Sequence, residues 1–523
     1  MTGIASHTVR PGHAGLTAAL GLLILLLIWE TGARALSDSY ILAAPSEVLV
    51  WLRDNRGLMA RALTQTLTNA AMGFAAGNLA AIALAGVALV WPGAQRTIMG
   101  LALLVFCLPL VATGPILRVL LGPGNGPQIW LAALAVYYTT LIPLLVGLRA
   151  APSVWLDLIR SYGRGRGAEL IYVRARAALP YLFAGLQIAT PAAFLGAMVG
   201  EFTGAERGMG VLTTRFIRAM DVPAVWALAS VAAAVSILAY AAIGWLAKAV
   251  LRDKPPIILA LPPARSAHGT RDALLVCVLA LLLWWGLMQG LGLSRFFAKR
   301  PGDVFDALFL APDAAETRMV LLDALIQTII YVVPGYLAGL ALGAGLAVLL
   351  ILAPALAAVA MPVAVALRSV PIVTTAPLIV LALGRGALGT TTLVAIMVFF
   401  PSFVACLHGL RQAPGQIMDV FDSYAAGPIS RLIHVRIPAM LPAFFAAARM
   451  SVPAAILAVT VIEWLATGRG IGSLMALSAS LSDYDMLWAS VVAVALLSVL
   501  CHAAVAMLER RVLRVFAAEQ AVT

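Results

Sequence analysis

Few side chains in this sequence are of a type and spacing that could do chemistry. There is no HExxH metal motif, no GxSxG with a matching triad, and no carboxylate cluster at metal spacing. A phosphate loop of the GxxxxGK[ST] type is excluded, because the lysines follow Ala, Asp and Ala rather than Gly. The four cysteines occur singly in apolar stretches, which favours packing over disulfides or metal binding. We therefore expect neither an enzyme nor a cofactor or metal bound by this chain.

The remaining candidates are polar groups and prolines within long apolar stretches, where a charge is costly and often marks a transport path. Glu201 and Glu463 end two such stretches and could flank the outer mouth of a path, or could only bond the amides of the following loop. Arg368 could face a path or only pack. Kinking prolines could line a cavity or only bend helices for packing. These prolines are Pro109, Pro115, Pro371 and Pro377.

Two long polar segments, 149–180 and 411–442, each end in Leu-Pro. Each reads as a short helix, a turn of small residues and a second helix, which predicts a hairpin that projects from the membrane; a plain amphipathic loop is the alternative. The residues of interest in the first segment are Asp157, Ser161, Tyr162, Gly163 and Pro180. Those of the second are Asp419, Ser423, Tyr424, Ala425, Pro438 and Pro442.

The elements that must position these residues cross a membrane. Of 523 residues, 62% are hydrophobic and only 11% are charged, whereas a soluble protein needs about 25% charged residues. The net charge of +12 comes without long basic runs or interleaved aromatic residues, so nucleic acid is not an expected partner. The basic residues are better explained by retention on the cytoplasmic side, next to anionic membrane lipid.

The sequence consists of two similar halves. Gln65-Thr66 returns 262 positions later as Gln327-Thr328, and Glu201 returns as Glu463. This constant offset indicates a tandem duplication, with halves at 1–251 and 272–523 joined by a Pro-rich cytoplasmic linker at 252–271. The first apolar run, 16–29, could pass for a signal peptide, but the matching run 274–293 opens the second half from the chain interior and argues against cleavage.

Each half contains six apolar stretches long enough to span a bilayer. We expect an all-α membrane protein of two parallel six-helix bundles, about 12 spans, with both termini cytoplasmic. The first-half spans are expected near 14–32, 62–90, 97–121, 128–149, 181–203 and 223–248. The second-half spans are expected near 272–292, 323–352, 357–383, 390–410, 443–465 and 485–508.

The two polar segments resemble the coupling motif of ABC importer permeases: a Glu-Ala-Ala triplet, a Gly six residues after the Glu, and a distal Leu-Pro. Asp157 and Gly163 match in the first half. In the second half Asp419 matches the Glu, and Ala425 replaces the glycine. Neither triplet is Glu-Ala-Ala, and only the first half keeps the glycine, so the resemblance implies that these segments contact an ATPase, with two unequal contacts.

The wider sequence is similar to permeases of the nitrate, sulfonate, taurine and bicarbonate type, through residues 367–384 and 462–472. The resemblance implies a type I ABC importer permease of the bacterial inner membrane, with two halves fused. It implies two copies of a cytoplasmic ATPase subunit that bind ATP and Mg, and an extracytoplasmic solute-binding protein. The substrate would be a small organic anion or a pyrimidine-type vitamin precursor. An ion-coupled secondary transporter built from parallel repeats is the alternative, and would need polar residues at mid-membrane.

Overall fold

The computed structural model describes residues 23–24, 26–36, 42–251, 269–356, 376, 379–380, 382–384 and 386–516. Within these residues the chain is helical and has no strand. The first half contains α2 (Pro45–Asp54), α3 (Arg56–Val90), α4 (Gln95–Phe106), α5 (Leu110–Leu121), α6 (Gly126–Arg149), α7 (Ser153–Ser161), α8 (Arg166–Ala168), η3 (Glu169–Arg174), α9 (Ala175–Phe202), α10 (Met209–Arg218) and α11 (Val222–Val250).

The described elements of the second half follow a similar order. It contains α12 (Gly269–Gly290), α13 (Pro301–Phe305), η4 (Asp306–Leu310), α14 (Ala314–Leu352), α17 (Ala387–Arg411), α18 (Gly415–Ser423), α19 (Pro428–Arg431), η6 (Leu432–Arg436), α20 (Ile437–Ile462), η7 (Glu463–Thr467), α21 (Ile471–Leu481) and α22 (Tyr484–Phe516). Short 3-10 turns at Pro92–Ala94 and Pro354–Leu356 follow α3 and α14.

Nine helices in the described ranges are long and apolar enough to cross a membrane, and the α4–α5 pair makes a tenth if it counts as one span. The all-α, multi-span prediction is therefore confirmed. The expected spans 14–32 and 357–383 lie largely outside the described residues. The predicted boundaries of the two halves and of the linker stay a prediction, since 252–268 are not described either.

The span expected at 97–121 is not one helix. Its two pieces, α4 and α5, meet at an angle of 93°. The break falls at Pro109, the residue before α5, where proline supplies no N–H and restricts the residue preceding it. Pro115, also expected to interrupt the helix, lies inside α5, which continues through it. One proline therefore breaks the helix and the other does not.

Close glycine contacts hold the centre of each half together. A Cβ on Gly73 would lie 2.3 Å from Ala132 Cβ, and one on Gly77 would lie 2.6 Å from a carbonyl of α6. Their second-half equivalents, Gly335 and Gly339, meet α17 at 2.6 Å in the same way. Small residues at four-residue spacing let two membrane helices approach closely. The glycines are thus a packing requirement of α3–α6 and α14–α17.

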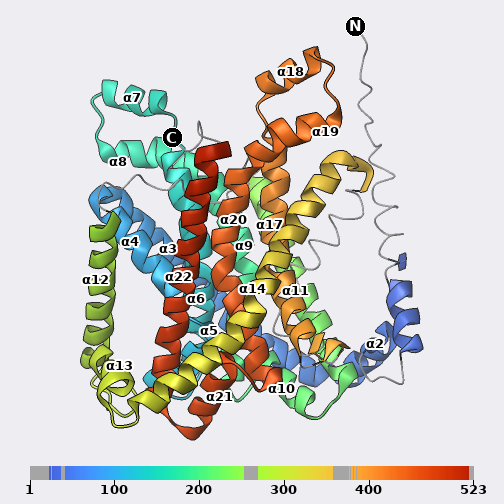
Figure 1. The fold of residues 1–523 in the computed structure, drawn as a ribbon, viewed down its shortest axis with the longest axis vertical. Helices are drawn as coiled ribbons and strands as arrows, with labels where there is room; N and C mark the ends of the chain where they lie inside the picture. Colours follow the sequence, from blue (N-terminus) through green and yellow to red (C-terminus); the bar gives the residue numbers. More distant parts are fainter. Residues whose placement is uncertain are drawn as a thin grey trace.

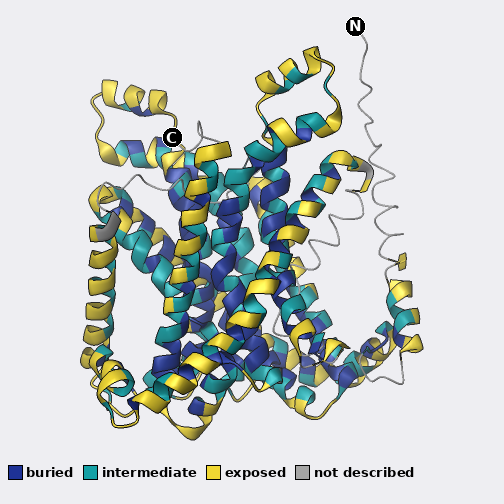
Figure 2. Cartoon of the chain, viewed as in Figure 1, coloured by how far each residue is buried: buried dark blue, intermediate teal, exposed yellow. Residues whose placement is uncertain are grey.

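The halves are joined through α5, which packs against α20, α21 and α22 of the second half. Buried residues line this central bundle, and exposed ones cover the outer helices (Figure 2). Only 6% of the most apolar window of the span at Arg271–Gly290 is buried, against 72% for α6. Such an exposed apolar helix suits lipid rather than water.

The two hairpins built from α7–α8 and α18–α19 project at one end of the molecule (Figure 1). α10 and α21 lie at the opposite end. The fold therefore separates the two groups of candidate residues by the full height of the bundle, with the hairpins at one end and the Glu201 and Glu463 loops at the other.

Candidate coupling hairpins and translocation path

The two predicted hairpins have the same backbone. α7 and α18 each have nine residues, and Gly163 and Ala425 follow them with φ of +68° and +51°. This left-handed conformation suits glycine and costs an L-residue about 1–2 kcal/mol. The substitution of Ala for Gly that the sequence shows at 425 thus keeps the turn and adds strain. Ser161 and Ser423 close the two helices by donating to the carbonyls of Leu158 and Val420 at 2.7 Å.

Apolar and aromatic side chains are exposed at the hairpin tips. Tyr162 and Tyr424 are 74% and 83% exposed, and Trp155 is 61% exposed. The triplet-position carboxylates of Asp157 and Asp419 are exposed as well. An exposed apolar patch rimmed by charge is typical of a protein interface.

The hairpins are braced by different ion pairs. Arg160 Nε lies 2.8 Å from Glu169 Oε1, and its Nη1 lies 3.3 Å from Asp157 Oδ1. The hydrogen bond to Glu169 raises the pKa of Arg160 above its usual value. In the second hairpin Arg431 pairs with Asp422 and donates to the carbonyl of Ala426 at 2.8 Å.

The Leu-Pro signals do not mark the start of the next spans. Pro180 and Pro442 lie inside α9 and α20, and Pro438 is in the first turn of α20. The π-helices η3 and η6 join each hairpin to its span, so the helices run continuously from 166 to 202 and from 428 to 465. A hairpin tied so directly to a span can pass movement to it.

At the other end, Glu201 is buried and holds the loop that follows it. Its carboxylate accepts from Thr66 Oγ1 at 2.8 and 3.0 Å and from the Gly210 amide at 2.8 Å. Thr66 Oγ1 in turn accepts from the Met209 amide at 2.9 Å. We call this set the carboxylate clamp. It ties the end of α9 to α3 and to the first turn of α10.

The second half has the same clamp. Glu463 accepts from Thr328 Oγ1 at 2.8 and 3.0 Å and from the Gly472 amide at 2.9 Å. The Ile471 amide donates to Thr328 Oγ1 at 3.0 Å. These bonds match the alternative in which the glutamates hold the following loops; a role in the path stays a prediction. Sequence reasoning missed Thr66 and Thr328 as partners, although both recur at the offset of 262.

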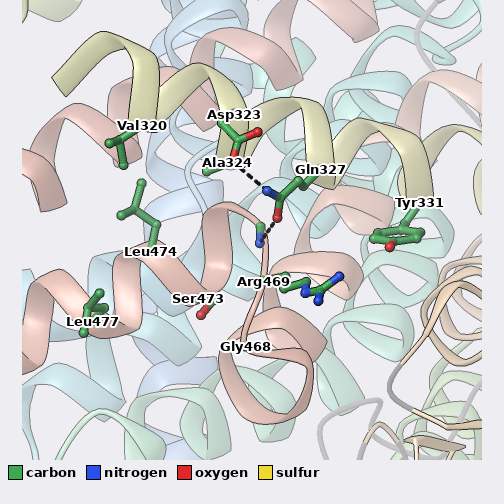
Figure 3. Close-up of a pocket in the computed structure, with 11 residues that line it drawn as sticks. Val320, Asp323, Ala324, Gln327, Tyr331, Gly468, Arg469, Ser473, Leu474 and Leu477 are labelled. Atoms are coloured by element: carbon green, nitrogen blue, oxygen red, sulfur yellow. Dashed lines mark hydrogen bonds between the residues drawn. The ribbon is translucent and has the colours of Figure 1, made fainter. Parts of the chain in front are cut away.

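A cavity of about 500 Å³ adjoins the second clamp, between α14 and the loop before α21 (Figure 3). Gln327 lies in its middle, donating to Asp323 at 2.7 Å and accepting from the Gly470 amide at 3.2 Å. Arg469 and Tyr331 also line it. The cavity lies at the end of the molecule away from the hairpins, beside the loop that the clamp holds.

Three predicted path residues, Arg368, Pro371 and Pro377, lie outside the described residues. A largely buried ion pair without a predicted role lies within the second half: Arg449 Nε lies 3.1 Å from Glu509 Oε2. The sequence alone could have pointed to Arg449, because this charged residue lies inside the apolar span expected near 443–465.

Comparisons with known proteins give one family, matched twice. The chain matches the binding-protein-dependent transport system inner membrane component at residues 77–252 and again at 335–514. It is 29% identical to a probable ABC transporter permease protein of Haemophilus influenzae, over 41% of this chain and 86% of the relative. No solved structure gives a significant match.

The names of two further relatives mention a substrate. The formylaminopyrimidine transport permease protein ThiX of Halalkalibacterium halodurans is 25% identical, over 45% of this chain and 94% of the relative. The putative aliphatic sulfonates transport permease protein SsuC of Escherichia coli is 29% identical, over 28% and 56%. The first two relatives align along most of their length with less than half of this chain, as expected for a chain that contains two permease halves.

Proposed function

Because the chain belongs to the family of binding-protein-dependent transport system inner membrane components, we propose that it forms, by itself, the whole translocation path of an ATP-driven importer. The observation that carries the proposal is the pair of hairpins at one end of the bundle, each with exposed aromatic residues and each continuous with a span. The hairpins would lie on the cytoplasmic side, together with both termini. The bundle would lie in the inner membrane, in contact with lipid.

Each hairpin would dock one copy of an ATPase subunit, which binds ATP and Mg. Asp157 and Gly163 would contact one copy, and Asp419 and Ala425 the other. Closure of the ATPase pair would move the hairpins and, through η3 and η6, the spans that follow them. At the opposite end a solute-binding protein would deliver the substrate beside the two carboxylate clamps.

The substrate would be a small organic anion or a pyrimidine-type compound. The names of the relatives, which refer to aliphatic sulfonates and formylaminopyrimidine, support both classes. The family match argues against the ion-coupled alternative.

The test is reconstitution of the purified chain in liposomes with its ATPase subunit and binding protein. The chain alone should hydrolyse no ATP, and uptake should need ATP and persist when ion gradients are collapsed. Uptake that follows an ion gradient without ATP would contradict the proposal.

Docking can be tested one hairpin at a time. Charge reversal by Asp157→Arg should release one ATPase copy, and Asp419→Arg should release the other, as measured by the mass of the complex. Loss of both copies from either change would contradict separate docking sites. Ser46→Ala, distant from both hairpins, is the control.

A further inference from the structure

The cavity beside the second clamp has charges of both signs on its wall. Its volume of about 500 Å³ is typical of small-molecule sites, and its lining includes Asp323 on α14 and Arg469 on the loop before α21. The Asp323 carboxylate accepts one hydrogen bond, from Gln327 Nε2 at 2.7 Å. In the described part of the chain the Arg469 side chain makes no hydrogen bond or ion pair, and both charged residues are exposed. Each charge is therefore available to a ligand.

A single side-chain amide keeps the two charges close to each other. Gln327 donates to Asp323 and accepts at 3.2 Å from the amide of Gly470, the residue that follows Arg469. Figure 3 shows Gln327 between the carboxylate and this loop, with the Arg469 side chain directed along the cavity toward Tyr331. The cavity thus offers a carboxylate and a guanidinium to one small ligand, which should carry both a cation and an anion.

The other end of the cavity is apolar. Figure 3 shows Val320, Leu474 and Leu477 at the end opposite Arg469. Val320 and Leu477 are 41% and 54% exposed, and exposed apolar side chains gathered at one place mark a contact with protein or membrane. A ligand held by the two charges would therefore extend an apolar part over Leu477.

The cavity lies where α14 enters its apolar part. The first ten residues of this helix contain Glu316, Arg318 and Asp323, whereas residues 324–352 contain no charged residue. About 20 helical residues cross the hydrocarbon core, and charges are costly inside it. Asp323 therefore lies at the level of the lipid headgroups, with the apolar part of the span beginning directly after it.

The first half differs at the equivalent place. Arg61, four residues before Gln65, takes the position of Asp323, and Arg215 on α10 takes the position of Leu477. Arg61 would repel an ammonium group, and Arg215 would place a charge where the apolar part of the ligand lies. The combination of a carboxylate, a guanidinium and an apolar end thus belongs to the second half.

We propose that this cavity binds the headgroup of a zwitterionic phospholipid of the ethanolamine type. The ammonium would be held by Asp323 and the phosphate by Arg469, both through charge-assisted hydrogen bonds, with the acyl chains leaving over Leu477. Because Gln327 also bonds the loop of the second clamp, the bound lipid would stabilise that loop. The inference does not depend on the proposed transport function.

The test is native mass spectrometry of the purified full chain in detergent, with an equimolar mixture of phosphatidylethanolamine and phosphatidylglycerol that have the same acyl chains. The wild type should retain phosphatidylethanolamine in preference. Arg469→Gln should weaken retention of this lipid about 10-fold or more, as expected for loss of a charged hydrogen bond. Asp323→Asn should do the same but leave phosphatidylglycerol retention equal or higher, because a repelling carboxylate is removed.

Both variants should keep the local structure, which separates lipid binding from damage to the fold. Asparagine retains an acceptor for Gln327, and the Arg469 side chain bonds nothing within the described ranges, so melting temperatures without lipid should match the wild type. Added phosphatidylethanolamine should raise the melting temperature of the wild type more than that of either variant. Arg207→Gln, at the first-half position equivalent to Arg469, is the control and should retain the lipid normally.

Three results would overturn the proposal. The first is retention of both lipids without preference by the wild type, or an unchanged preference in both variants. The second is calorimetric binding of free phosphoethanolamine as tight as that of the lipid, which would indicate a site for a soluble zwitterion. The third is loss of solute-binding-protein capture by both variants with unchanged lipid retention, which would indicate a protein docking surface.

Discussion

The two carboxylate clamps and the two hairpins have diverged to different degrees since the duplication. The Glu201 and Glu463 clamps have equivalent hydrogen bonds whose lengths agree within 0.1 Å. The hairpins keep their backbone but are braced by different ion pairs. A buried group must satisfy its donors and acceptors internally, so it tolerates little change. Exposed groups are solvated and can change freely. Between these two regions, the buried hydrogen bonds were kept in both halves and the exposed ion pairs were not.

The largest loss of stability is expected when a Cβ is placed against a carboxylate clamp. On Gly208 it would lie 2.2 Å from the Glu201 carboxyl carbon, and on Gly470 it would lie 2.1 Å from Glu463 Oε1. Both glycines also have positive φ, +135° and +84°. Gly208→Ala and Gly470→Ala should each destabilise the protein by about 3 kcal/mol or more, the sum of backbone strain and overpacking.

The measurement is the apparent melting temperature in detergent. Gly427→Ala is the control, because a Cβ there meets nothing within 4 Å and its φ is −66°. Tolerance of one substitution and not of its twin would show that the clamps are not equivalent.

Removal of a clamp carboxylate should have the next largest effect. Glu201→Ala or Glu463→Ala leaves the buried amide of Gly210 or Gly472 without an acceptor, at about 1–3 kcal/mol for an unsatisfied group. The threonine hydroxyl keeps only the carbonyl four residues earlier on its own helix. Gln retains an acceptor oxygen and should cost less. Melting temperatures check this order.

Uptake by the Glu201→Gln, Glu463→Gln double variant tests whether the clamps also serve the path. Reduced uptake with intact ATPase docking would support a path role. Wild-type rates at normal expression would restrict both residues to holding their loops.

A smaller and opposite pair of effects is expected at the hairpin turns. Gly163→Ala introduces a side chain at φ +68°, and Ala425→Gly removes one at +51°. The first should destabilise its hairpin and the second should stabilise its own, each by about 1 kcal/mol. Amide hydrogen exchange over 153–166 and 415–427 reports the two changes separately. If the stability of both hairpins changed in the same direction, the two hairpins would not share the same left-handed turn.

The smallest effects are expected from the ion pairs of the hairpins. Arg160→Gln should change hydrogen exchange only slightly, because Arg160 is 57% exposed and its pairs are screened by water. Arg431→Gln should do more, since Arg431 is 32% exposed and also bonds a carbonyl. When both hydrogen-exchange measurements are repeated at high salt, the difference between Arg160→Gln and the wild type should disappear first. A larger effect at Arg160 would reverse this order.

Hydrophobic composition and the repeat sufficed to predict a two-half, all-α membrane protein, because a bilayer accepts few structures and a duplication preserves spacing. The small residues between the two short helices of each polar segment also predicted the turn at Gly163 and Ala425, because a turn depends on local residue types. Asp221 and Asp483 cap α11 and α22, because each accepts from an amide three residues on, which is also a local contact.

Only the tertiary structure decided which polar groups meet. Glu201 and Thr66 are 135 residues apart, and Arg449 and Glu509 are 60 apart on different helices, so no local pattern pairs them. The break at Pro109 but not at Pro115 also depended on packing, because a proline within a helix is tolerated where neighbouring helices compensate. Local sequence determined the helices and turns of this chain. The contacts between helices, which depend on how the two halves pack, determined where its charges are buried and with which partners.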